Sequence, residues 1–317
     1  NCLFGVDINP NSVKICRLRL WIELLKNAYY KAPDYKELET LPNIDINIKS
    51  GNSLISRFAL DADLKKALKE SKWNIESYKN AVSTYRDAES KEQKREMEEL
   101  ISTIKGNFRK EISTNSREIK DLVKCTAEYN NKYVVEKLFE DALSKAQIKN
   151  KKTLEEEIRK LTDKIESIKS NKMYDNAFEW RFEFPEVLND NGDYIGFDAI
   201  IGNPPYIQLQ KLGQDSLDLE KMSYETFAKT GDIYSLFYEL GFNLLKPKGL
   251  LTFITSNKWM RAAYGESLRK FFVEKTNPLI LIDFGGVQVF DTATVDTNIL
   301  IGEKANYSSE TSACILG

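Results

Sequence analysis

The pattern of apolar and polar positions divides the chain into three stretches of different character. In residues 1–59, the runs "LFGVDI" and "IDINIKS" are typical of short strands. Between them, apolar residues recur three or four positions apart, as in a helix: Val13, Cys16, Leu20, Leu24 and Ala28. Asn11 or Ser12 is the expected N-cap. The first stretch is therefore predicted to contain a strand, a helix and a second strand.

Residues 60–175 lack proline and are rich in Lys, Glu, Ser and Asn. Apolar residues recur there at intervals of three, four or seven, including Leu64, Leu68, Tyr78, Val82, Ile101, Ile104, Phe108, Leu154, Ile158, Leu161 and Ile165. Such seams favour long antiparallel helices packed as a coiled-coil-like arm, with turns expected near Gly106-Asn107 and within 115–133. Acidic residues interleave with the lysines, so a solvated face is the favoured interpretation over a DNA-binding one.

Residues 176–317 return to short apolar runs separated by helical patterns. The segments "FDAIIG", "LLTFITS", "LILIDFG" and "TNILIGEK" are typical of strands, and "DIYSLFYELGFNLLKPKG" and "GESLRKFFVEK" of helices. Pro247 and Gly249 are expected to end the first of these helices. Strands that alternate with helices predict a mostly parallel sheet. The helical arm of 60–175 is thus expected to interrupt one α/β domain formed by residues 1–59 and 176–317.

Composition narrows the possible chemistry. Hydrophobic residues make up 42% of the 317 residues, enough for a substantial core, and the net charge is −2. The sequence contains no histidine, which removes the commonest general base and the commonest zinc ligand, and we expect no metal. The four cysteines are scattered, which favours reduced thiols and a cytoplasmic location. No apolar run approaches the roughly 20 residues of a membrane helix, so we expect no membrane partner.

The tetrapeptide Asn203-Pro204-Pro205-Tyr206 directly follows the predicted strand "FDAIIG". Proline cannot donate to a sheet ladder, so the strand must end there, and ligands of parallel α/β sheets bind beyond the carboxyl ends of the strands. The Asn203 side-chain oxygen and the Pro204 carbonyl would form two rigid acceptors beside the Tyr206 ring. This set suits a planar amine. A tight Pro-Pro turn that only caps a core strand is the alternative interpretation.

Two further polar residues end predicted strands. Asp7 follows "LFGV", where a carboxylate can accept both hydroxyls of a ribose, and Asn52 follows "IDINIKSG", where its amide can contact a purine edge. The alternatives are an acidic residue at a helix start for Asp7 and a turn residue for Asn52.

With these motifs the sequence resembles the N6-adenine DNA methyltransferases that carry an N-P-P-Y motif. More narrowly, it is similar to the methyltransferase part of type IIG restriction–modification polypeptides and to the related phage-exclusion methyltransferases. The resemblance covers nearly all of both α/β segments but not the helical arm. The matching stretches are "FGVDINPNSVKICRLRLWIELL", "GNSLI", "FEWRFEFPEVL", "FDAIIGNPPYIQLQKL", "GDIYSLFYELGFNLLKPKGLLTFITSNKW", "GESLRKFF" and "IDFGGVQVFDTATVDTNILI". N-P-P-Y by itself is shared with methyltransferases of other substrates.

The resemblance implies a Rossmann-like sheet that binds S-adenosylmethionine over its carboxyl edge and acts on an adenine of double-stranded DNA. Asp7 would hold the cofactor ribose, and Ile8, Asn52 and Ser53 would lie near the cofactor adenine. The catalytic site would comprise Asn203, Pro204, Pro205 and Tyr206. The flipped target base would stack between Tyr206 and Phe290, although Phe290 could also be an ordinary core residue. C5-cytosine methylation is excluded, because that chemistry needs a nucleophilic cysteine, usually after proline, and no cysteine here follows one.

The sequence departs from the family in two places. The glycine-rich loop that wraps the methionine part of the cofactor is expected before Asn1, and a target-recognition domain after Gly317. We therefore expect this segment alone to be a fragment that binds the cofactor weakly and shows little catalysis, and its full-length parent to be a candidate endonuclease as well. Two alternatives stay open: a methyltransferase acting on protein glutamine or ribosomal RNA, and a non-catalytic scaffold. The recognition sequence and the oligomeric state are not predicted.

Overall fold

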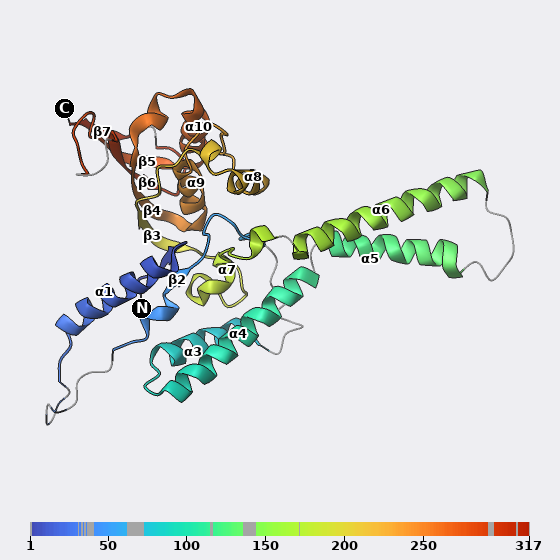
Figure 1. The fold of residues 1–317 in the computed structure, drawn as a ribbon, viewed down its shortest axis with the longest axis horizontal. Helices are drawn as coiled ribbons and strands as arrows, with labels where there is room; N and C mark the ends of the chain where they lie inside the picture. Colours follow the sequence, from blue (N-terminus) through green and yellow to red (C-terminus); the bar gives the residue numbers. More distant parts are fainter. Residues whose placement is uncertain are drawn as a thin grey trace. The chain divides into compact units, whose positions relative to one another are not determined.

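The computed structural model describes residues 2–30, 32, 34, 36, 41–61, 73–114, 117–135, 144–170, 172–290, 295–308 and 310–316. The chain forms two compact units. The first comprises Asn1–Ser50, Phe58–Asn176 and Asn189–Asp193, and the second comprises Gly51–Arg57, Ala177–Leu188 and Tyr194–Gly317. Their elements are labelled in Figure 1. The domain boundaries expected from the sequence, 1–59, 60–175 and 176–317, stay a prediction.

The first unit begins with two parallel strands joined through a helix. Strand β1 (Gly5–Asp7) pairs with β2 (Ile48–Ser50), and α1 (Pro10–Lys26) lies between them in sequence. The N-cap of α1 is Asn9, whose side chain accepts the Asn11 N–H at 2.9 Å. The prediction of Asn11 or Ser12 as the cap was wrong, because Pro10 occupies the first helical position and the cap must precede it. The strand expected over "IDINIKS" is also shorter than predicted, since η1 (Ile44–Ile46) takes up its first half.

The rest of the first unit is helical, in α3 (Ile75–Arg86), α4 (Lys91–Thr114), α5 (Arg117–Asn130), η2 (Asn131–Val135), α6 (Lys145–Ser170) and η4 (Lys172–Tyr174). Tyr78 of α3 and Phe108 of α4 are fully buried, and their rings meet edge to face at 6.2 Å. The turn expected at Gly106 was wrong: α4 continues through this residue, at a propensity cost of about 1 kcal/mol that tertiary packing offsets. Most of the turn region expected within 115–133 is likewise helical, in α5. The coiled-coil-like packing of the arm stays a prediction.

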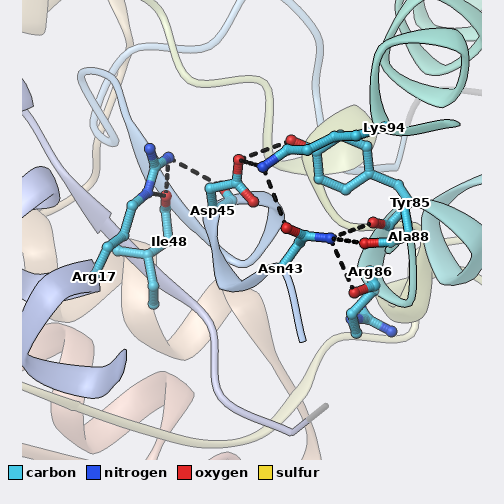
Figure 2. Close-up of polar contacts among 8 residues, drawn as sticks. All are labelled: Arg17, Asn43, Asp45, Ile48, Tyr85, Arg86, Ala88 and Lys94. Atoms are coloured by element: carbon cyan, nitrogen blue, oxygen red, sulfur yellow. Dashed lines mark hydrogen bonds and ion pairs between the residues drawn. The ribbon is translucent and has the colours of Figure 1, made fainter. Parts of the chain in front are cut away.

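A polar cluster ties α3 and α4 to the segment that leads into β2 (Figure 2). The Asn43 amide donates to the carbonyls of Tyr85 and Ala88, each at 3.0 Å. Lys94 of α4 pairs with the Asp45 carboxylate at 2.9 Å, and the Tyr85 hydroxyl donates to the same carboxylate oxygen at 2.7 Å. The start of the helical region is therefore fastened to η1 by charge-assisted hydrogen bonds.

The second unit is built on a mixed sheet in the order β3-β4-β6-β5-β7. Its strands are β3 (Phe197–Gly202), β4 (Leu245–Ser256), β5 (Asn277–Asp283), β6 (Thr297–Glu303) and β7 (Ser312–Ile315). β3 and β4 run parallel, as do β5 and β7, but β6 is antiparallel to both of its neighbours. The α/β class is confirmed. The sheet of the second unit is mixed rather than mostly parallel, because β6 runs antiparallel to both β4 and β5.

Helices α9 (Tyr234–Leu244) and α10 (Glu266–Lys275) contribute to one core cluster with the sheet. The cluster contains Tyr234, Tyr238, Phe242, Leu245, Leu251, Phe253, Trp259, Leu268, Phe271, Phe272 and Leu300. β4 starts at Leu245, directly after α9, so Pro247 and Gly249 lie within the strand rather than at the helix end. A register shift between Phe197 and Ala199 accommodates them, and Lys248 has φ 65°.

Shorter elements complete the second unit: α7 (Trp180–Glu183), η5 (Pro185–Val187), η6 (Leu209–Lys211), α8 (Gln214–Lys221), η7 (Asn257–Met260) and η8 (Ala263–Gly265). Among the described helices of either unit, none combines the length and apolar character that a membrane crossing requires.

Candidate functional site

The tetrapeptide Asn203-Pro204-Pro205-Tyr206 lies at the carboxyl end of β3, as predicted. The strand ends at Gly202, where an added Cβ would lie 2.9 Å from the Phe253 ring, so this position admits no side chain without movement. Asn203 and Pro205 are exposed, Pro204 is buried and Tyr206 is half-buried. The close approach of β3 to Phe253 therefore holds the start of the tetrapeptide against β4.

Two acceptors at this strand end have no donor within the described part of the chain. Neither the Asn203 side chain nor the Pro204 carbonyl receives a hydrogen bond from any described residue. The exposed Asn203 side chain can therefore accept an N–H group without breaking an internal bond, and the carbonyl of the buried Pro204 also has no internal donor to lose.

The Tyr206 ring is held from two sides. Its hydroxyl donates to the Ile254 carbonyl of β4 at 3.1 Å, and the buried Tyr234 ring meets it edge to face at 6.2 Å. Burial raises the pKa of the Tyr206 hydroxyl above its usual value, so this group stays a neutral donor at physiological pH. The aromatic ring is thus fixed beside the two acceptors.

Phe290 lies in the second unit and is half-buried. Its carbonyl accepts a hydrogen bond from the Gln288 amide at 2.9 Å. Among the described residues, no ring contact joins Phe290 to Tyr206. The pairing of these two rings around a base stays a prediction.

The predicted cofactor residues of the first unit lie at the carboxyl end of β1: Asp7 is its last residue and Ile8 follows it. One carboxylate oxygen of Asp7 accepts the Asn9 N–H at 2.7 Å, and the exposed carboxylate keeps its second oxygen for a ligand. Ile8 is 65% exposed, so its side chain is open to contact with a ligand. These features fit a ribose and an adenine.

Asn52 and Ser53 belong to the second unit, in a segment held by hydrogen bonds. The Asn52 side-chain oxygen accepts the Leu54 N–H at 3.2 Å, which leaves its NH2 group and the second lone pair of the oxygen for a purine edge. The Ser53 carbonyl accepts the Trp180 indole N–H at 3.0 Å. The buried Glu179 carboxylate accepts the Ser56 hydroxyl at 2.7 Å and the Arg57 N–H at 2.9 Å. The turn at Asn52 is therefore preorganised, but the joint role of Asp7, Ile8, Asn52 and Ser53 stays a prediction.

A buried polar network behind the tetrapeptide was missed by sequence reasoning. Thr255 of β4 exchanges a hydrogen bond with the Tyr238 hydroxyl at 3.0 Å and donates to the Asn298 side-chain oxygen at 3.1 Å. The same oxygen accepts the Trp259 indole N–H at 3.2 Å. The network fastens η7 to the carboxyl end of β4. Its only sequence signal is the presence of Thr255 and Asn298 in otherwise apolar runs.

Two buried carboxylates, also missed, shape the loop that follows α8. Glu239 of α9 accepts the backbone N–H groups of Glu225 and Thr226 at 3.2 and 2.8 Å. Asp232 accepts the Tyr264 hydroxyl at 3.2 Å. These bonds join residues 224–232 to α9 and to η8.

Comparison with known proteins gives the family. Residues 1–290 match the family described as Eco57I restriction-modification methylase. The chain belongs to this family. Because this is a family of methylases, the cofactor is S-adenosylmethionine.

Among curated relatives, a putative type II restriction enzyme and methyltransferase of Methanocaldococcus jannaschii is 26% identical over 98% of this chain and 26% of its own length. The type II restriction enzyme and methyltransferase RM.Eco57I of Escherichia coli is 36% identical over 36% of this chain and 12% of its own length. The chain thus spans about a quarter or less of these relatives.

Solved structures are more distant. A putative class I S-adenosylmethionine-dependent methyltransferase of Listeria monocytogenes aligns with 81% of this chain and 90% of its own, at a TM-score of 0.32 and 14% identity. The type IIG restriction endonuclease BpuSI aligns with 50% of this chain and 22% of its own, at a TM-score of 0.31 and 13% identity. Similarity this low carries no argument about mechanism.

Proposed function

We propose that this chain is the catalytic part of a site-specific DNA methyltransferase that transfers the methyl group of S-adenosylmethionine to the exocyclic amine of adenine. The observation that carries the proposal is the pair of unoccupied acceptors, the Asn203 side-chain oxygen and the Pro204 carbonyl, beside a fixed aromatic ring. A primary amine on a planar base offers two N–H donors and a flat face, which this arrangement matches.

The exocyclic nitrogen of adenine is a weak nucleophile because its lone pair is delocalised into the ring. Asn203 and Pro204 accept its two N–H bonds and favour a more tetrahedral nitrogen, which directs the lone pair away from the ring. Bound S-adenosylmethionine supplies an electrophilic methyl group on a positively charged sulfur. Positioning therefore contributes more than base catalysis, which suits a chain without histidine, and the surplus proton leaves to water.

An adenine inside a duplex cannot reach this strand end, so the base must be flipped out of the stack. The Tyr206 ring then packs on one face of the base, and Phe290 on the other. On the cofactor side, Asp7 would accept the ribose hydroxyls and Ile8 would pack on the cofactor adenine. Asn52 would contact the purine edge, with Ser53 near the same adenine.

Family membership and the names of the relatives support DNA as the substrate. Those names also include restriction enzymes, but the chain spans 26% of one such relative and 12% of another. We assign neither DNA cleavage nor sequence recognition to the described residues.

The test uses the full-length protein in a host without DNA methylation. Genomic DNA is digested to nucleosides, N6-methyladenine is measured by mass spectrometry, and the modified positions are mapped by sequencing. We expect a signal that disappears in Asn203→Ala and persists in Asn306→Ala, a control that removes an exposed asparagine of the same unit. Methylated protein glutamine or ribosomal RNA, with unmodified DNA and folded protein, would contradict the proposal.

A further inference from the structure

The cations of the second unit fall into two groups. Most are engaged within the chain: Lys221 with Asp218, Lys246 with Asp198, Lys270 with Glu274, Lys275 with Glu225, and Arg269 and Lys304 with backbone carbonyls. Five exposed cations have no side-chain partner among the described residues: Lys211, Lys229, Lys248, Lys258 and Arg261. Lys248 lies near the start of β4. The other four, Lys211, Lys229, Lys258 and Arg261, are called the cation group and lie in or beside segments at the opposite end of the sheet.

Backbone pairing places Lys211 and Lys229 at the same end of one short ladder. The Leu209 N–H donates to the Gly231 carbonyl at 2.8 Å, and the Ile233 N–H donates to the Ile207 carbonyl at 2.9 Å. The two segments run antiparallel. Leu209 and Gly231 pair at one end of this ladder. Lys211 lies two residues after Leu209 and Lys229 two residues before Gly231, so both lysines lie just beyond that end.

Lys258 and Arg261 lie in the loop after β4, which is fixed to that ladder. The Tyr264 hydroxyl donates to Asp232 at 3.2 Å, and a Cβ at Gly231 would lie 3.5 Å from the Tyr264 ring. The Arg269 guanidinium donates to the carbonyls of Trp259 and Ala262 at 2.6 and 2.9 Å. The loop that carries Lys258 and Arg261 is therefore rigid.

The cation group lies close to the proposed site for the target base. The Tyr206 hydroxyl contacts the Ile254 carbonyl, and Lys258 follows Ile254 by four residues. Ser256, the last residue of β4, lies roughly 7 Å further along the strand than Ile254. Lysine and arginine side chains at this distance reach the phosphates on either side of a nucleotide whose base contacts Tyr206.

We propose that Lys211, Lys229, Lys258 and Arg261 bind the phosphates that flank the flipped adenine. This inference rests on the proposed function. The chain has a net charge of −2, so its attraction for DNA must come from a local excess of positive charge, and these four cations provide one without breaking an internal ion pair.

The test measures DNA binding by the full-length protein as a function of salt. Fluorescence anisotropy gives the Kd for a labelled duplex that contains the mapped methylation site, with a methylase-inert cofactor analogue present. Each substitution of the group, Lys211→Gln, Lys229→Gln, Lys258→Gln or Arg261→Gln, is expected to lower the slope of log K against log salt by about 0.9. The control Lys248→Gln, at the other end of β4, is expected to leave the slope unchanged.

An unchanged slope in the fourfold variant, or an equal loss in Lys248→Gln, overturns the inference. Thermal melting of each variant excludes unfolding as the cause of a lost slope. The two proposals can fail separately, because binding is measured without methyl transfer. If the wild-type protein methylates adenine but the substitutions leave the salt slopes unchanged, only the proposal for the cation group is overturned. If no methylation is found and therefore no site is mapped, the same slopes are measured on a duplex of arbitrary sequence. Lowered slopes there overturn the assigned reaction but support phosphate binding by the cation group.

Discussion

Tyr206 shows how one residue can serve both the fold and the proposed reaction. Its hydroxyl is bonded to the Ile254 carbonyl, which sets the direction of the ring, and its ring packs against the buried Tyr234. The hydroxyl and the ring can therefore be tested separately.

We predict that Tyr206→Phe lowers the free energy of unfolding by about 1 kcal/mol, because the Ile254 carbonyl loses its donor, and changes methylation little. Tyr206→Ala also removes the stacking face, worth roughly 1–3 kcal/mol for a base, so kcat/KM for DNA is expected to fall by about 10- to 100-fold. Urea unfolding and steady-state kinetics of the full-length protein measure the two effects. Equal kinetic loss in both variants would instead assign the hydroxyl a part in the chemistry.

At the residue level, the sequence predicts the acceptors but not what supports them. Asn203 and Tyr206 could be found because the intervening prolines must end a strand. Thr255 and Asn298 could not, because their hydrogen bonds join strands that are 43 residues apart, and periodicity predicts which face a residue occupies but not its partner. The same limit applies to Glu239, which binds a loop rather than its own helix neighbours.

At the scale of elements, the strands and helices of the second unit were largely predictable and their pairing was not. "FDAIIG" corresponds to β3 and "GESLRKFFVEK" to α10, since each carries a strong period and clear end signals. The antiparallel direction of β6 depends on contacts with β4 and β5 that no local pattern contains. Local chemistry also set the true ends of α1 and α9, where competing signals lay only two or three residues away.

The polar cluster around Asp45 gives an element-scale prediction about pH. Burial alone would raise the pKa of Asp45, but hydrogen bonds from Lys94 and Tyr85, together with the charges of Lys94 and Arg17, outweigh burial and lower it. Because the pKa of Asp45 is lower in the folded than in the unfolded chain, its carboxylate stabilises the fold at pH values above the unfolded-state pKa of about 3.9. This contribution is lost as the pH falls through the folded-state pKa. We expect Asp45→Asn to lower the free energy of unfolding by about 1 kcal/mol at neutral pH, with the difference from wild type closing below about pH 4.

Urea unfolding of both proteins across this pH range measures the difference. Asp190→Asn is the matched control in the same unit, because the Asp190 side chain is 94% exposed and pairs with Lys79 only at 3.4 Å. We expect little change from it at any pH. A difference between wild type and Asp45→Asn that persists undiminished in acid would show that charge is not its source.

At the scale of the whole molecule, the chain belongs to a methylase family and combines a sheet edge that offers two acceptors with a segregated group of cations. Net charge is a poor guide to this function: the chain carries −2 overall, yet most unpaired cations of the second unit occupy one end of its sheet. The pattern along the sequence predicted the class of fold. It did not predict the segregation of charge, because that depends on which lysines and arginines have acidic partners in the folded chain.

The most direct test of the central claim is the single-turnover rate of methyl transfer by the full-length protein on a duplex containing the mapped site. We predict that Asn203→Ala lowers this rate by about 100- to 1000-fold, the usual effect of removing one preorganised hydrogen-bonding partner of the transition state. The fluorescence of 2-aminopurine placed at the target position should still rise on binding, because Tyr206 is intact and the base is still flipped. A rate for Asn203→Ala within about threefold of wild type would mean that the activation free energy changes by less than about 1 kcal/mol. That result would contradict the assignment of Asn203 as an acceptor for the reacting amine.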